Sequence, residues 1–174
     1  MTQSGASVHA SAVRVGNRAV LIRGPSGAGK SRLALDLILA GRAGQIATAM
    51  LIGDDRVHLT ASDGRLMVRP ALELAGLIEI RGLGIRRCDF VDEAVVDLVV
   101  DLAAADAERL PPSEALQTQI SGIKIPRIPV GIGFAAFPLV TAALTMTASS
   151  SSSQSSADCS KEIGNHISPT IATK

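Results

Sequence analysis

Short apolar runs separated by turn residues make up the first part of the chain. Residues 8–15 and 19–23 are rich in valine and alanine and are joined at Gly16-Asn17, which predicts two strands in a hairpin. Residues 31–40 are largely apolar and are followed by Gly41, which predicts a helix that stops at this glycine.

Later apolar runs are shorter and predict further strands. Residues 57–60 and 66–68 flank Ser62-Asp63-Gly64 and predict a second hairpin. Residues 123–130 contain two prolines, which suits an edge strand or an extended segment better than a central strand. Single strands are predicted over residues 46–52, 77–81 and 95–102.

The run "LIEIRGLGI" at residues 77–85 combines a strand pattern with charge. Side chains alternate between faces along a strand, so Glu79 and Arg81 point one way while Ile78 and Ile80 point the other. The isoleucines can face a core, and the charged pair must face water, each other or a ligand. A half-buried edge strand that ends in a glycine-rich loop is the alternative to a functional site.

The C-terminal part of the chain has a different composition. Residues 147–174 include the run "TASSSSSQSSADCS", which has almost no apolar side chains and cannot bury enough surface to offset chain entropy. We therefore expect one folded domain over residues 1–146 and a disordered serine-rich tail over residues 147–174.

Composition restricts the class of protein. Hydrophobic residues make up 47% of the 174 residues and aromatic residues only 2%, so the core must consist of Ala, Val, Ile and Leu. A formal net charge of +1 gives no reason to expect nucleic acid or a membrane surface as a partner. No signal peptide, membrane-spanning run, disulfide framework or zinc motif is visible, so we expect a cytoplasmic protein.

The run "GPSGAGKS" at residues 24–31 matches the G-x-x-x-x-G-K-[ST] pattern of a phosphate-binding loop (P-loop, or Walker A motif), between a predicted strand and a predicted helix. Lys30 can neutralise β- and γ-phosphate oxygens, and the Ser31 hydroxyl can bind Mg²⁺. The pattern predicts a site for a nucleoside triphosphate or another phosphate-rich ligand; the alternative is a chance glycine-rich turn. The predicted ligand-binding residues are Gly24, Pro25, Ser26, Gly27, Ala28, Gly29, Lys30 and Ser31.

The run "LIGDDRV" places Asp54 and Asp55 at the end of an apolar segment. A carboxylate there resembles a Walker B position, where it can hold Mg²⁺ or accept a proton from an attacking hydroxyl. Adjacent residues at a strand end point to opposite sides, so the two aspartates would have different roles. A polar turn is the alternative, and the upstream P-loop favours the functional interpretation.

Taken in order, "GPSGAGKS", "LIGDD" and "IEIRGLGI" resemble the HPr kinase/phosphorylases, bacterial enzymes that phosphorylate a serine of the phosphocarrier protein HPr. The resemblance covers about residues 8–130. It implies an α/β P-loop kinase domain with a mixed β-sheet, similar to the phosphoenolpyruvate carboxykinases, with ATP and Mg²⁺ as cofactors and HPr as partner.

The resemblance also implies roles for individual residues. Glu79 would bind Mg²⁺ together with Ser31, and Asp55 would accept the proton of the protein serine. Arg81 and the two glycines after it would form the loop used in phosphoryl transfer and its reversal.

Two further catalytic residues follow from the same resemblance. His9 lies 21 residues before Lys30, the spacing at which the family carries a catalytic histidine. Arg109 resembles the arginine that acts at the phosphoryl site, although a helix-end arginine paired with Glu108 or Asp106 explains it equally well.

The sequence also departs from the family pattern. His9 lies near the start, so we expect no separate N-terminal domain, as in the short proteobacterial members. The segment "GIGFAAFPLVTAAL" lacks the Arg-Asn pair of a loop tied to dephosphorylation, which weakens the expectation of phosphorylase activity. Residues 135–145 resemble a remnant of the family's C-terminal helical segment. The hexamer of the long enzymes is therefore not expected here, and a homo-oligomer of another size is the alternative to a monomer.

Three hypotheses remain from the sequence. The first is an ATP-dependent serine kinase that phosphorylates HPr in a phosphotransferase-system regulatory pathway. The second is a catalytically impaired ATP-binding module that acts through partner binding. The third is a small-metabolite kinase, which the "IEIRGLGI" run disfavours.

Overall fold

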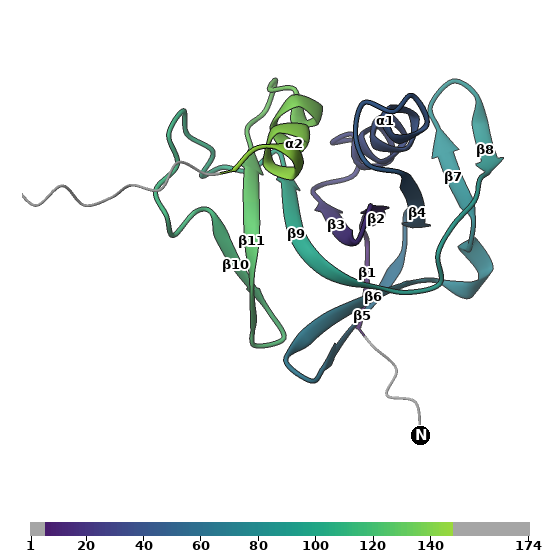
Figure 1. Cartoon of the computed structure of the whole chain (residues 1–174), viewed down its shortest axis with the longest axis horizontal. Coiled ribbons are helices and arrows are strands. Elements are labelled where there is room, and N and C mark those ends of the chain that lie inside the picture. Colours follow the sequence, from purple (N-terminus) through teal and green to yellow (C-terminus); the bar gives the residue numbers. More distant parts are fainter. Residues whose placement is uncertain (1–5, 148–174) are drawn as a thin grey trace, which may run out of the picture.

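The computed structural model describes residues 6–147 and contains one mixed sheet, a separate hairpin and few helices (Figure 1). The first strands are β1 (Ala6–Val8), β2 (Ser11–Val15), β3 (Arg18–Arg23), β4 (Ala49–Gly53), β5 (Val57–Ser62) and β6 (Arg65–Pro70). The later strands are β7 (Leu77–Ile80), β8 (Gly84–Arg87), β9 (Ala94–Leu102), β10 (Gln117–Ile120) and β11 (Ile123–Val130). The helices are α1 (Lys30–Arg42), the short 3-10 helix η1 (Leu72–Leu74) and α2 (Ala136–Thr145).

Strand β9 organises the main sheet, whose path runs β1-β5-β6-β9-β3-β2-β4. The start of β9 pairs antiparallel with β6, while its later residues pair parallel with β3 and with β11, which in turn carries β10. Figure 1 shows β9 as a long, strongly curved strand that joins these parts. The predicted α/β class with a mixed sheet is confirmed.

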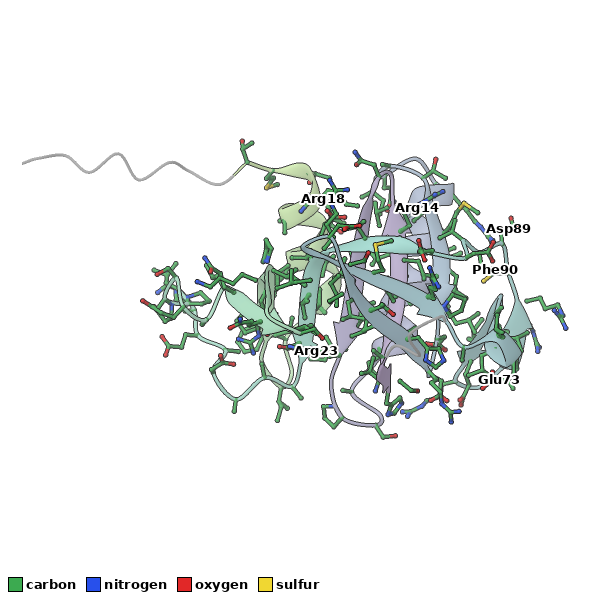
Figure 2. All side chains as sticks on the ribbon, turned by 90° about the horizontal axis from the view of Figure 1, so that it is seen from below. Arg14, Arg18, Arg23, Glu73, Asp89 and Phe90 are labelled. Carbon is green, nitrogen blue, oxygen red and sulfur yellow. The ribbon has the colours of Figure 1, made fainter. Side chains whose placement is uncertain are left out.

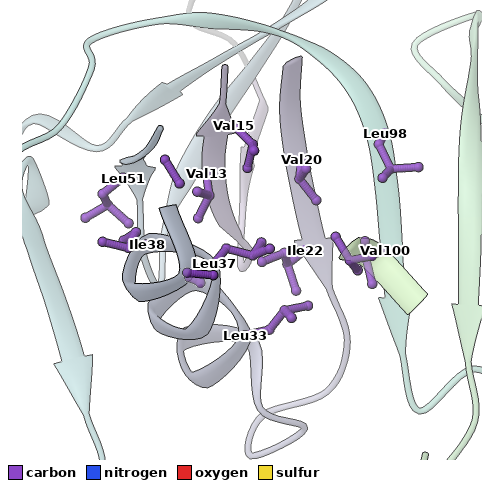
Figure 3. Close-up of a cluster of buried hydrophobic side chains, with 14 of the residues drawn as sticks. Val13, Val15, Val20, Ile22, Leu33, Leu37, Ile38, Leu51, Leu98 and Val100 are labelled. Atoms are coloured by element: carbon purple, nitrogen blue, oxygen red, sulfur yellow. The ribbon is translucent and has the colours of Figure 1, made fainter. Parts of the chain in front are cut away.

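Alternating side chains of the sheet fill two apolar clusters. In β3, Val20 and Ile22 pack into the cluster that contains α1, whereas Ala19 and Leu21 pack into the cluster on the opposite face. Helix α1 contributes Leu33 to the first cluster, together with other residues of one helix face (Figure 3). Because α1 is fixed to the sheet in this way, its first turn has a defined position relative to the strand ends.

The sequence predicted that the helix stops at Gly41. In the structure, α1 includes Gly41 and continues to Arg42. A Cβ atom on Gly41 would lie 2.6 Å from the backbone nitrogen of Ala49 at the start of β4. The glycine therefore allows close contact between helix and strand and is not a stop signal.

Several strand predictions need correction. The strand predicted over residues 8–15 is broken at His9-Ala10, because β1 pairs with β5 while β2 pairs with β3 and β4. Strand β11 is not a simple edge: its first half pairs with β10 and its second half with β9. Pro126 and Pro129 therefore each lie in a half-strand that has a neighbouring strand on one side only. A missing N–H group is tolerated on the unpaired side.

Outside residues 6–147 nothing is described, so the predicted tail lies outside the described residues except for Thr147. Residues 135–145, expected to be a helical remnant, contain α2. Within residues 6–147, no helix has the length and apolar character needed to cross a membrane.

Candidate functional site

The predicted P-loop joins the end of β3 to the start of α1. Gly24, Gly27 and Gly29 all have positive φ angles, of 145°, 79° and 100°, which favour glycine. A Cβ atom on Gly24 would lie 2.9 Å from the carbonyl oxygen of Leu102, so this glycine also permits close approach to the end of β9. The motif thus has the strand–loop–helix context that the sequence predicted.

Lys30 lies across this loop. Its side-chain Nζ donates hydrogen bonds to the carbonyl oxygens of Gly24 at 3.0 Å and Pro25 at 3.1 Å. Lys30 is buried, with 6% of its surface exposed. The ammonium group therefore lies inside the curve of the loop, where a bound phosphate would meet both it and the N-terminus of α1.

Asp54, at the end of β4, connects three elements of the site. It is 3% exposed, and its Oδ1 accepts hydrogen bonds from Ser11 Oγ at 2.5 Å and Ser31 Oγ at 2.9 Å. Its Oδ2 accepts a hydrogen bond from the backbone N–H of Glu79 at 3.1 Å. The sequence placed Asp54 and Asp55 together at a Walker B-like position without specifying the role of Asp54, and no sequence signal pointed to Ser11.

Asp55 and His9 form a second, more exposed pair. His9 Nε2 lies 3.1 Å from Asp55 Oδ1, and the two side chains are 52% and 63% exposed. Asp55 has a φ of 66°, which is unusual for a residue other than glycine. This conformation lets two adjacent aspartates face different partners, as the sequence analysis expected.

Glu79 and Arg81 lie on the β7 side of the same cavity. Ile78 is 2% exposed, whereas Glu79 and Arg81 are exposed, so the alternation predicted for this strand is present. Strand β8 was not predicted; it pairs with β7, and Gly82 and Gly84 in the connection have positive φ angles. The hairpin lies beside α1 (Figure 1).

These groups line one cavity of about 620 Å³. Its charged and polar groups come from the P-loop, from α1 and from the β7–β8 hairpin, together with His9 and Asp55. Arg109 is exposed and does not line this cavity, nor does it form any of the ion pairs found among the described residues. Arg81 does line this cavity, and its guanidinium lies 3.9 Å from the place where a Gly27 Cβ would be.

The donor set fits the metal role that the resemblance implied. Within residues 6–147 no cluster of three His, Cys, Asp or Glu side chains could hold an ion without help. Mg²⁺ commonly uses one or two protein oxygens and completes its shell with phosphate oxygens and water. Ser31 and Glu79 offer such oxygens, and Asp54 holds both residues in place.

An ion-pair network supports the start of the P-loop. Arg23, the residue before Gly24, is labelled in Figure 2. It donates hydrogen bonds to both oxygens of Asp101, at 2.7 and 2.8 Å. Arg127 donates to Asp101 at 2.5 Å and also pairs with Asp106. Burial raises the pKa of Asp101, but hydrogen bonds from the two arginines outweigh it and hold the pKa below its usual value. This network joins β3, β9 and β11.

The chain is similar in sequence and in fold to known proteins. Residues 2–163 match the family model described as the HPr Serine kinase C-terminal domain. The solved structure of an Hpr(Ser) kinase/phosphatase from Coxiella burnetii superposes with a TM-score of 0.64 and 28% sequence identity, covering 80% of this chain and 93% of that one.

Curated relatives give the same family. An HPr kinase/phosphorylase from Mycoplasma mycoides subsp. mycoides is 36% identical over 129 residues, which cover 69% of this chain and 38% of the relative. An HPr kinase/phosphorylase from Streptococcus thermophilus is also 36% identical, with coverage of 72% and 42%. The chain thus spans about two fifths of the length of these relatives.

Proposed function

The chain belongs to the HPr serine kinase C-terminal domain family, and from its site we propose that it is an ATP-dependent protein kinase that phosphorylates a serine of HPr. The observation that carries the proposal is that the Asp55–His9 pair lines the same cavity as Lys30 and the P-loop. The similarity to phosphoenolpyruvate-carboxykinase-like P-loop kinases stays a prediction, as does a role in phosphotransferase-system regulation.

We propose that ATP places its phosphates on the P-loop. The backbone N–H groups of the loop and the N-terminus of α1 would bind phosphate oxygens, and Lys30 would neutralise the transferring group. Arg81, on the β7 side, would add a second positive charge there. Mg²⁺, bound through Ser31 and Glu79, would supply charge neutralisation between the phosphates.

Asp55 is proposed as the base. Phosphoryl transfer depends mainly on positioning and charge stabilisation, and a carboxylate that accepts the serine proton aligns the weak hydroxyl nucleophile. The close contact between His9 Nε2 and Asp55 Oδ1, at 3.1 Å, would fix the orientation of this carboxylate. Arg109 has no role in this proposal, because it lies outside the cavity.

We propose that transfer to HPr outweighs the reverse reaction. The loop after β11 has the sequence Gly131-Ile132-Gly133-Phe134 in place of the Arg-Asn pair that the resemblance led us to expect. The same loop, together with the position of Arg109, favours one alternative: an ATP-binding module with impaired catalysis that acts by binding its partner.

A transfer assay separates these functions. The protein is mixed with Mg-ATP and purified HPr, and phosphoserine is measured by mass spectrometry. We expect phosphoserine with the wild-type chain and with Lys124→Ala, which changes an exposed lysine of β11, but not with Lys30→Ala. ATP binding without any transfer would support the alternative module, and no ATP binding would overturn both.

A further inference from the structure

A second cavity, of about 490 Å³, lies on the other side of the P-loop. It is lined by the loop itself, by the end of β9 and by the segment from Val130 to Phe137 that joins β11 to α2. Gly27, Gly29, Arg32 and Asp36 line both cavities, so the two cavities meet at the P-loop.

The two cavities differ in charge. The first contains His9, Lys30, Asp55, Glu79 and Arg81. Arg32 and Asp36 supply the only charged side chains of the second cavity within residues 6–147, and they pair with each other, with Arg32 Nε 2.9 Å from Asp36 Oδ1. The second cavity therefore favours an uncharged, apolar group.

Two phenylalanines give the second cavity its aromatic surface. Phe137 is half-buried and packs against the core cluster, which fixes its position. Phe134 is 73% exposed and covers Gly131, whose Cβ position would lie 3.2 Å from the ring. An exposed aromatic ring beside a phosphate-binding loop offers a face on which a planar ring can stack.

From these observations we propose that the second cavity binds the nucleobase of the nucleotide, with Phe134 as its stacking residue; the inference rests on the proposed kinase function. A triphosphate on the P-loop must direct its γ-phosphate toward Asp55 for transfer, so its nucleoside end extends away from the first cavity. The volume of the second cavity lies in the range of small-molecule sites. The resemblance ties the loop at this position to dephosphorylation, but it assigns no role to the phenylalanines that this chain carries there.

The test compares ATP with inorganic tripolyphosphate, which has the phosphates but no base. Binding of each to the protein with Mg²⁺ is measured by calorimetry. We expect the wild-type chain to bind ATP more tightly, and Phe134→Ala to weaken ATP binding about 5- to 150-fold, the effect typical of removing one stacking ring. Tripolyphosphate binding should stay unchanged. Leu72→Ala, which removes a 90% exposed side chain that lines neither cavity, should change neither affinity.

Phe134→Trp gives a second readout. The chain contains no tryptophan or tyrosine, so this substitution places a single fluorophore in the cavity. It should retain ATP affinity, and ATP, but not tripolyphosphate, should change its emission.

Any other result contradicts either this inference or the proposed function. Equal affinity of the wild-type chain for ATP and tripolyphosphate, or unchanged ATP affinity in Phe134→Ala, overturns the inference but leaves the P-loop site intact. If Phe134→Ala instead raises the KM for HPr at unchanged ATP affinity, the cavity is a docking site for the partner and the inference is wrong. Binding of neither ligand would overturn the proposed function and this inference with it.

Discussion

Replacing Asp54 with asparagine should weaken the connection between the P-loop helix, β2 and β7. In the native chain, Asp54 Oδ1 accepts hydrogen bonds from Ser11 and Ser31, and Oδ2 accepts one from the Glu79 backbone N–H. Asparagine keeps one oxygen and replaces the other by an amino group. If that oxygen keeps both hydroxyl bonds, the amino group faces the Glu79 N–H, donor against donor.

The size of the effect follows from these contacts. A buried donor left without a partner costs about 1–3 kcal/mol, and each hydroxyl bond loses about 1 kcal/mol when its acceptor is no longer charged. Removing a buried charge offsets part of this loss. We therefore expect the free energy of unfolding to fall by about 2–4 kcal/mol, which corresponds to a Tm lower by roughly 5–15 °C for a chain of this size.

The assay is urea unfolding followed by circular dichroism, because the chain has no tryptophan or tyrosine for intrinsic fluorescence. Asp97→Asn is the matched control: Asp97 is half-buried and accepts one backbone hydrogen bond, from Ala19 at 2.9 Å. It should cost about 1 kcal/mol. If Asp54→Asn costs no more than this control, or if hydrogen exchange at the Glu79 amide is unchanged, Asp54 does not hold the three elements together.

Three further predictions concern catalysis, pH and packing. Asp55→Asn should lower the rate of phosphorylation at least 100-fold and leave ATP binding intact. The control, Asp63→Asn, changes another aspartate with positive φ and should retain full activity. Equal turnover in both variants would exclude Asp55 as the base. Since the folded-state pKa of Asp101 is lowered, its stabilising effect is present above its unfolded pKa, about 3.9, and is lost as the pH falls through the folded value. Asp101→Asn should therefore flatten the loss of stability below about pH 4 in acid titrations, and an unaltered acid profile would contradict the ion-pair network. Gly41→Ala should lower stability by about 1–2 kcal/mol, because the contact with Ala49 outweighs the gain in helix propensity; a stabilised variant in urea unfolding would show that the helix and strand can separate.

The sequence predicted the elements that depend on local pattern. The P-loop motif, the helix after it and the alternation in β7 are properties of neighbouring residues, and the structure places them as expected. The strand over residues 8–15 was predicted as continuous, because nothing local shows that β1 and β2 pair with different strands.

The sequence could not indicate the parts of the site that depend on distant residues. Asp54 is important because Ser11 and Glu79 meet there, 43 and 25 residues away along the chain. Arg109 was assigned to the phosphoryl site from the family resemblance, and it is not among the residues that line the cavity. Residue type and spacing could not indicate which arginines line the cavity beside the P-loop.

The contact between the P-loop and β9 has a consequence for synthesis on the ribosome. Arg23 and Gly24 are made early, yet Asp101, which pairs with Arg23, and Leu102, which lies close to Gly24, follow 78 residues later. Until β9 has left the exit tunnel, β3 lacks its parallel neighbour and the P-loop lacks its support. A nascent chain that ends before β9 should therefore be unable to bind nucleotide, although its whole P-loop motif has already been translated.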